Sequence, residues 1–268
     1  MYAETAHSFE CDGEWLTAIV TAPQQPARRG VLILVGGPQY RAGSHRQFVL
    51  LARTLAQQGI PSFRFDVRGM GDSTGAPRSF EATASDIQTA IGHFFAIQPG
   101  LAEVVLWGLC DAASAALLHA VKDTRVRSLV LLNPWVRSSQ TAAQATLKHY
   151  YHSRLFDAGF WKKLIAGQFQ PAAAMRSFAR LAAAARRPAD STLPSRMLQG
   201  LQRFPGPVLV ILSGRDLTAR EFSDVCLRSS EWKNRIALRE LAEANHTFAR
   251  AEWRAQVAAW TAEWVKSC

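Results

Sequence analysis

Cysteine is scarce in this chain of 268 residues, and its four residues, Cys11, Cys110, Cys226 and Cys268, lie far apart. They lack the C-x-x-C spacing of zinc sites, and four scattered thiols do not make the dense pattern of a disulfide-stabilised domain. We therefore expect reduced thiols, and we expect neither a metal nor a cofactor.

Long apolar runs are also missing. No stretch reaches the roughly 18 uninterrupted apolar residues that a membrane helix needs. The first residues include Glu4, His7 and Glu10, without the apolar core of a signal peptide. The sequence thus predicts no transmembrane segment, no secretory signal and a cytoplasmic location.

The chain does contain 48% hydrophobic residues, and many of them form short apolar runs that alternate with helix-like segments. Such runs are typical of strands buried on both faces of a parallel sheet, and the alternation indicates a doubly wound α/β fold. A hairpin is expected at 7–22. Further strands are expected at 31–35, 62–67, 104–107, 126–132, 207–212 and 235–241, and helices at 46–58, 81–98, 111–118, 221–232 and 251–266.

The strand rhythm is lost between residues 136 and 204. Helix-like pieces replace it at 142–151, 160–168 and 171–187, in a region rich in alanine, arginine and aromatic residues. We expect a core domain made of residues 1–135 and 205–268, with residues 136–204 inserted after the sixth strand as a basic helical lid.

The turn Gly108-Leu109-Cys110-Asp111-Ala112 carries the main chemical signal. It joins a buried strand to an alanine-rich helix, and small residues on either side of Cys110 allow the sharp reversal that a nucleophile elbow requires. The amides of a helix N-terminus favour negative charge, and so favour a thiolate. We interpret Cys110 as a nucleophile; the alternative is a cysteine that only packs in the core.

Two further residues complete a catalytic constellation. Asp216 follows the strand at 207–212 and His246 follows the last strand, so nucleophile, acid and histidine come in the order that α/β-hydrolases use. His246 would take the proton of Cys110, and Asp216 would hold the imidazole in the required tautomer. Other acids near these positions are expected to be solvated surface charges: Glu221, Asp224 and Glu243. Asn133, at another strand end, is not ionisable, which favours Asp216.

An oxyanion hole is expected next to the elbow. The loop Gly36-Gly37-Pro38-Gln39 follows a buried strand, and in this architecture that loop supplies one oxyanion donor. Pro38 has no amide hydrogen, so the donor is Gly37 or Gln39, together with the amide of Asp111. We expect the substrate site to be lined by Gly36, Arg41, His45 and Trp135. Two nearby serines, Ser73 and Ser114, are interpreted as structural.

These motifs resemble a known family. The segments VLILVGGPQYRAGSHRQF, FRFDVRGMGDS, WGLCDAAS, SGRD and ANHTF are similar to the α/β-hydrolase superfamily, and most to the family called exosortase A system-associated hydrolase 1. The resemblance implies the α/β-hydrolase fold and hydrolase chemistry linked to bacterial exopolysaccharide and exosortase systems. The chain departs from the common pattern with cysteine for serine, Ala112 for glycine, and Gly36-Gly37 for His-Gly. The cysteine resembles that of dienelactone hydrolases and polyhydroxyalkanoate synthases.

The positive charge is concentrated in one region. Residues 137–203 hold eleven basic and two acidic side chains, and so nine of the ten net positive charges. Charge placed over an active site steers an anionic substrate into it, whereas no nucleic-acid-binding module accompanies these residues. We expect a small or acyl-carrying anionic substrate and no nucleic acid; the alternative is a solvated basic helical face.

Three functions follow from these patterns. The first is a hydrolase that cleaves an ester, lactone or thioester through an acyl-cysteine at Cys110. The second is an acyltransferase that forms the same intermediate and passes the acyl group to another acceptor. The third is a catalytically idle binding protein, in which the basic insertion is an interface.

Overall fold

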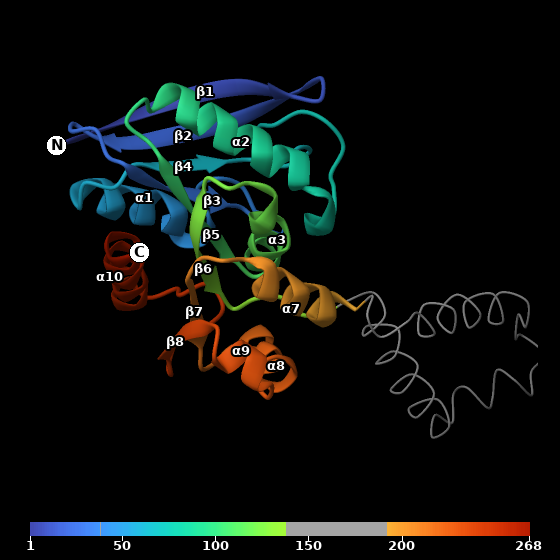
Figure 1. Cartoon of the computed structure of the whole chain (residues 1–268). Coiled ribbons are helices and arrows are strands. Elements are labelled where there is room, and N and C mark those ends of the chain that lie inside the picture. The colour runs from blue at the N-terminus through green and yellow to red at the C-terminus, as the bar shows by residue number, and fades with distance from the viewer. Residues whose placement is uncertain (38, 138–191) are drawn as a thin grey trace, which may run out of the picture. The chain divides into compact units, whose positions relative to one another are not determined.

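The computed structural model describes residues 1–37, 39–137 and 192–268 (Figure 1). The chain divides into two compact units, one formed by Met1–Trp135 with Met197–Cys268 and the other by Val136–Arg196. The helix-like pieces expected at 142–151, 160–168 and 171–187 lie outside the described residues, and the expected lid at 136–204 stays a prediction.

The first unit is built on an eight-stranded sheet in the order β1-β2-β4-β3-β5-β6-β7-β8. Strand β2 runs antiparallel to its neighbours β1 and β4, and every other neighbouring pair is parallel. The strands are β1 (Tyr2–Cys11), β2 (Glu14–Pro23), β3 (Arg29–Leu34), β4 (Ser62–Phe65), β5 (Glu103–Leu109), β6 (Val126–Leu132), β7 (Val208–Ser213) and β8 (Ile236–Leu241). The expected mainly parallel, doubly wound sheet is confirmed.

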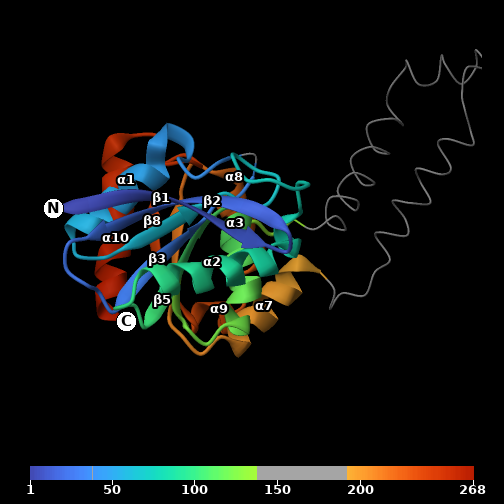
Figure 2. The ribbon, with the colours of Figure 1, turned by 90° about the horizontal axis from the view of Figure 1, so that it is seen from above.

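Helices cover both faces of this sheet. Figures 1 and 2 show α1 (Gln47–Gln57) and α10 (Ala251–Ser267) on one face, and α2 (Ala84–Ile97) and α3 (Asp111–His119) on the other. The remaining described α-helices are α7 (Leu193–Arg203), α8 (Leu217–Val225) and α9 (Ser230–Lys233). Short 3₁₀ turns at Ser44–Arg46, Phe80–Ala82 and Ala120–Lys122 precede or follow helices.

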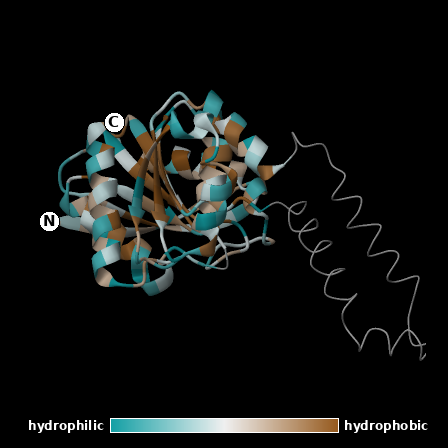
Figure 3. Ribbon diagram, turned by 90° about the horizontal axis from the view of Figure 1, so that it is seen from below, coloured by the Kyte–Doolittle hydropathy of each residue, from teal (hydrophilic) through white to brown (hydrophobic). Residues whose placement is uncertain are grey.

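The central strands are apolar because both of their faces are buried. Every residue of β7 is buried, and in β3, β5 and β6 only one residue near the start of each strand is not. Figure 3 shows this as a hydrophobic layer between the helices. Side chains such as Val31, Val105 and Leu209 join residues of α1 and α10 in one apolar cluster. Burial of this apolar surface fixes the sheet register and therefore the positions of the strand ends.

The hairpin β1–β2 turns at Asp12-Gly13. Both residues have positive φ, 51° and 82°, as the two central positions of a type I′ turn require. Asp and Gly tolerate this conformation better than other residues, so the predicted hairpin forms where expected.

Two helix predictions were incomplete. The helix expected at 221–232 is instead two helices, because Asp216 caps the start of α8 and Ser229 caps the start of α9. Helix α7 was missed, although Leu193, Met197 and Leu201 follow the i, i+4, i+8 spacing of a buried helix stripe. Among the described residues, the helices are all too short or too polar to cross a bilayer.

Candidate active site

The turn between β5 and α3 holds Cys110 in a strained conformation. Its φ is 62° and its ψ is −123°, a backbone region that a non-glycine residue rarely adopts. Strain of this kind is what the nucleophile elbow of an α/β-hydrolase requires. The Cys110 amide donates to the Leu132 carbonyl at 2.8 Å, and the Cys110 carbonyl accepts from the Trp135 amide at 3.2 Å. The turn is thereby anchored to the end of β6.

Small residues around Cys110 make this turn possible. A Cβ atom built on Gly108 would lie 2.6 Å from the backbone of Ala112, so α3 packs directly against β5 at this point. Ala112 is itself buried. The small residues of the pattern Gly-x-Cys-x-Ala therefore allow a close strand–helix contact. The Cys110 side chain is half-buried beyond the C-terminal end of β5.

His246 and Asp216 meet at the same edge. The Nδ1 atom of His246 lies 2.9 Å from Oδ2 of Asp216, although 30 residues separate them. Asp216 is buried and caps α8, accepting from the amides of Thr218 at 3.3 Å and Ala219 at 3.1 Å. These helix amides fix the carboxylate, which in turn orients the imidazole.

The pKa values of this pair are shifted toward the charged forms. Burial acts to raise the pKa of Asp216, but the hydrogen bond and charge of His246 and the two helix amides hold it below its ordinary value. The pKa of His246 is raised to about 10, first by its hydrogen bond to Asp216 and then by a hydrogen bond with Cys110. Both Asp216 and Cys110 thus favour the charged form of the imidazole.

Asn133 is a structural member of the site whose role the sequence did not indicate. It is buried, with φ at 42°, just beyond β6. Its Nδ2 donates to Oγ of Ser213 at 2.9 Å and to the His246 carbonyl at 3.2 Å, and its Oδ1 accepts from the Ser213 amide at 2.8 Å. Asn133 therefore ties the ends of β6 and β7 to the histidine loop. A polar residue at a strand end is the only signal the sequence offers.

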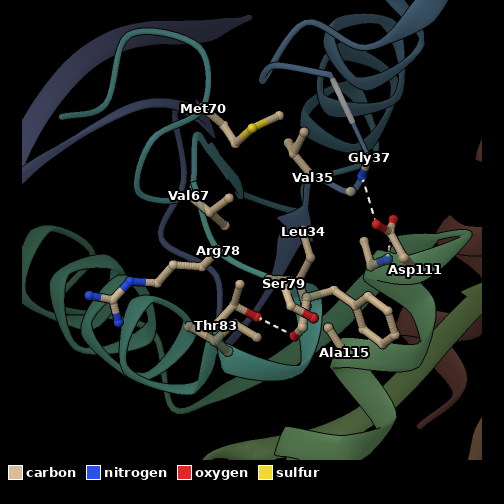
Figure 4. Close-up of a pocket in the computed structure, with 14 residues that line it drawn as sticks. Leu34, Val35, Gly37, Val67, Met70, Arg78, Ser79, Thr83, Asp111 and Ala115 are labelled. Carbon is tan, nitrogen blue, oxygen red and sulfur yellow. Dashed lines mark hydrogen bonds between the residues drawn. The ribbon is translucent and has the colours of Figure 1, made fainter. Parts of the chain in front are cut away.

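The expected oxyanion loop faces the elbow. The Gly37 amide points at the elbow and donates to Oδ2 of Asp111 at 2.9 Å, and Oδ1 of Asp111 accepts from the Ala112 amide at 2.9 Å (Figure 4). A Cβ atom on Gly36 would lie 2.0 Å from Oδ1 of Asp111, so this position requires glycine. The side chain of Gln39 accepts from the Ser44 amide at 3.4 Å.

The other residues expected to line the substrate site have varied surroundings. The guanidinium of Arg41 forms ion pairs with Asp66 and Asp72. His45 is exposed in a turn with φ at 54°. The Trp135 carbonyl accepts from Oγ of Ser114 at 2.6 Å. Their roles in substrate binding stay predictions.

The structural interpretation of the two serines is confirmed. Ser114 is buried and donates to the Trp135 carbonyl. Ser73 donates to the Asp66 carbonyl at 2.7 Å and accepts from the Thr17 amide at 2.9 Å. Both hydroxyl groups are thus engaged with the backbone.

A cavity of about 290 Å³ lies beside the Gly37–Asp111 pair. Figure 4 shows Leu34, Val35, Val67 and Met70 around this space, with the Arg78 side chain extending away from Asp111. Its apolar lining comes from the end of β3, the loop after β4, the 3₁₀ turn Phe80–Ala82, α2 and α3: Leu34, Val35, Val67, Met70, Phe80, Ile87, Ala112 and Ala115. The polar side chains that line it are Arg78, Ser79, Thr83 and Asp111. Such a cavity suits an apolar ligand group.

Comparisons with known proteins identify the family to which this fold belongs. The model of the "Alpha/beta hydrolase family" matches residues 31–260. Protein ABHD12B of Homo sapiens is 32% identical over 116 residues, 40% of this chain and 31% of that protein. Polyketide transferase claH of Penicillium crustosum is 31% identical over 94 residues, 33% of this chain and 30% of that protein. The chain thus spans less than a third of the length of these curated relatives.

Among solved structures, the Pyrococcus furiosus esterase PF2001 superimposes with a TM-score of 0.69 and 13% identity. The match covers 99% of this chain and 91% of that one. This likeness shows the α/β-hydrolase fold, with an eight-stranded, mostly parallel sheet. Because the family model matches most of its length, the chain belongs to the alpha/beta hydrolase family.

The raised pKa of His246 gives a direct test of the pair. Replacing Asp216 with Asn removes the largest cause of the shift, so the pKa of His246 should fall from about 10 toward its ordinary 6.5. Because the pKa is raised in the folded state, the stabilisation is complete below about pH 6.5 and is lost as the pH rises toward about 10. Asp216→Asn should therefore lower the free energy of unfolding more at pH 6 than at pH 10. Histidine NMR titration and urea unfolding measure the two effects.

The matched control is Glu243→Gln. Glu243 lies in the same loop as His246, and the substitution removes an exposed carboxylate that forms an ion pair with Arg215. It should leave the His246 titration where it is in the wild type. An unchanged His246 pKa in Asp216→Asn would contradict the assignment of Asp216 as its partner.

Proposed function

We propose that this protein cleaves an ester, lactone or thioester through an acyl-enzyme formed at Cys110. The observation that carries the proposal is the 2.9 Å distance between Nδ1 of His246 and Oδ2 of Asp216, together with the strained turn that holds Cys110 after β5. The raised pKa of His246, to which both Asp216 and Cys110 contribute, supports it. A nucleophile, a base and a group that orients the base form the minimal unit of covalent acyl catalysis.

The reaction takes place in two steps. Sγ of Cys110 attacks the substrate carbonyl carbon while His246 takes up or already holds the thiol proton. The tetrahedral intermediate then expels the alcohol or thiol, which receives that proton from His246 and leaves an acyl-cysteine. In the second step His246 takes a proton from water as the water attacks the thioester, and Cys110 departs as the thiolate. Asp216 keeps the imidazole oriented through both steps.

The oxyanion of each tetrahedral intermediate would lie at the end of α3. The amides of Asp111 and Gly37 are the proposed donors, since the Gly37 amide already points at the elbow. The Gln39 amide is the alternative to Gly37. Backbone donors fixed by secondary structure cost little reorganisation during the reaction.

The cavity indicates the acyl part of the substrate. Its apolar lining and volume of about 290 Å³ suit an unbranched or small acyl group, next to the amides that would bind the carbonyl oxygen. The basic residues between 137 and 203 favour an anionic leaving portion, such as a phosphate-bearing acyl carrier or an acidic glycan. We propose that this chemistry serves bacterial exopolysaccharide production in the cytoplasm, and the resemblance of GLCDA and FDVRGMGDS to exosortase-associated hydrolases supports this link.

Acyl transfer is a second candidate. The acyl-cysteine is a thioester and stays reactive toward alcohols and amines as well as water. One relative of this chain carries the name polyketide transferase, which favours considering acceptors other than water. Analysis of the products formed with and without added alcohols or amines separates the two functions.

Intact-mass measurement after mixing with p-nitrophenyl butyrate or a butyryl thioester tests the acyl-enzyme. The wild type should gain one butyryl group, whereas Cys110→Ala should gain none. Cys268→Ala is the matched control, because it removes another half-buried thiol far from the elbow and should still acylate. A butyryl adduct that persists in Cys110→Ala, or a wild type that is never acylated, would overturn the proposal.

Filling the cavity should change the preference for acyl length. Ala115 is buried on α3 and lines the cavity, and leucine preserves the helix while occupying the space. Loss of room for even one methylene in an apolar pocket costs about tenfold or more in specificity. The ratio of kcat/KM for hexanoyl over acetyl esters should therefore fall by about tenfold or more in Ala115→Leu. The acetyl ester is the internal control, and an unchanged ratio would place the acyl chain elsewhere.

A further inference from the structure

We propose that the side chain of Asp111 is a resident occupant of the oxyanion hole, which a substrate carbonyl must displace before Cys110 reacts. The inference rests on the proposed function, because it takes acyl chemistry at Cys110 as given. It assigns to Asp111 a role in specificity in addition to that of its backbone amide.

The hydrogen bonds of Asp111 support this role. Oδ2 of Asp111 accepts from the Gly37 amide at 2.9 Å, and Oδ1 accepts from the Ala112 amide at 2.9 Å. Of the proposed oxyanion donors, the carboxylate therefore engages the Gly37 amide. It does so at the first residue of α3, whose own amide is the other proposed donor.

The surroundings of Asp111 hold it in this place. The close approach of Gly36 leaves no room for any side chain at that position, so the carboxylate lies directly against the loop. Figure 4 shows the Gly37 amide pointing at this carboxylate at one side of the cavity. The carboxylate thus lies where the carbonyl oxygen of an acyl group held in the cavity would accept the same hydrogen bond.

A carboxylate in this position has two consequences. Charge-assisted hydrogen bonds to an ionised carboxylate are stronger than those to a neutral ester carbonyl, so the resident group competes effectively with a substrate. An ionised Asp111 also repels an oxyanion that develops beside it. Burial raises the pKa of Asp111, against the opposing effect of the surrounding amides, so its neutral form is more accessible than that of an exposed aspartate.

The expected selectivity follows from this competition. Substrates with weakly polar carbonyls and no further binding energy should react slowly, whereas those anchored by the rest of the molecule displace Asp111 more readily. Free carboxylates, which resemble the resident group, should bind poorly to the wild type. The Asp111 carboxylate thus limits inhibition of the enzyme by a carboxylic acid product.

The test uses Asp111→Ala, which vacates the hole, and Asp111→Asn, which keeps the shape but removes the charge. Butyraldehyde is the first probe: the Cys110 thiol adds across its C=O bond, Sγ bonds to carbon, and the thiol proton is transferred to the new oxygen. Because a charge-assisted hydrogen bond no longer competes, Asp111→Ala should bind butyraldehyde about tenfold to a hundredfold more tightly than the wild type. Asp111→Asn should lie between the two.

Butyrate is the second probe, and it needs no reaction at Cys110. Butyrate binding is followed by the NMR shift of the Gly37 amide. Butyrate should change this shift in Asp111→Ala and leave it unchanged in the wild type. This measurement separates the inference about Asp111 from the proposed acyl-enzyme function, because it still reports on the oxyanion hole if Cys110 is never acylated. Weaker aldehyde binding in both variants, without butyrate binding, would mean that Asp111 braces the loop and would overturn the inference. If Asp111→Ala does not fold, unchanged aldehyde affinity in Asp111→Asn would overturn it equally.

Discussion

The backbone of Cys110 is the constraint on which the site depends. A φ of 62° between a buried strand and a helix is costly, and it persists only because the surrounding structure leaves no alternative. Gly108 and Ala112 let α3 approach β5, while the end of β6 holds the turn from the other side through Leu132. The indole of Trp107 on β5 donates to Thr261 on α10 at 3.3 Å, so the strand is fixed from the opposite face as well.

Around this turn the sheet brings together groups that are far apart in sequence. Parallel strands end at one edge, and the chain places a polar residue beyond each of β5, β6 and β7. Asn133 joins two of these ends to the histidine loop, and Asp216 is held by the first turn of α8. The proposed catalytic groups are thus oriented by backbone amides and one buried carboxamide, which are rigid partners.

Much of this arrangement could be predicted from the sequence. The apolar runs indicated the strands because burial on both faces leaves no room for polar side chains. The order of Cys110, Asp216 and His246 indicated a candidate site, and its catalytic role stays a prediction. The structure brings Asp216 and His246 into contact, and both Asp216 and Cys110 act to raise the pKa of His246.

Other features depend on three-dimensional contacts that residue type does not reveal. The start of α8 is set by the Asp216 side chain, so one residue both caps this helix and contacts His246. From the sequence, Asn133 looks like an ordinary residue at the end of a strand. Its role depends on hydrogen bonds to Ser213 and His246, which only the structure reveals. The amide of Asp111 is predicted to lie in the oxyanion hole, but the hydrogen bond that its carboxylate accepts from the Gly37 amide depends on the close approach of Gly36.

The most direct test of the account is the rate of Cys110 alkylation by iodoacetamide against pH, followed by peptide mass analysis, in the wild type and in His246→Ala. If His246 activates the thiol, labelling of the wild type should stay fast well below the free-thiol pKa of about 8.5, and the variant should lose this fast reaction. Slow labelling that rises only near that pKa, and that is indifferent to His246, would contradict an activated cysteine and favour a binding function for this fold.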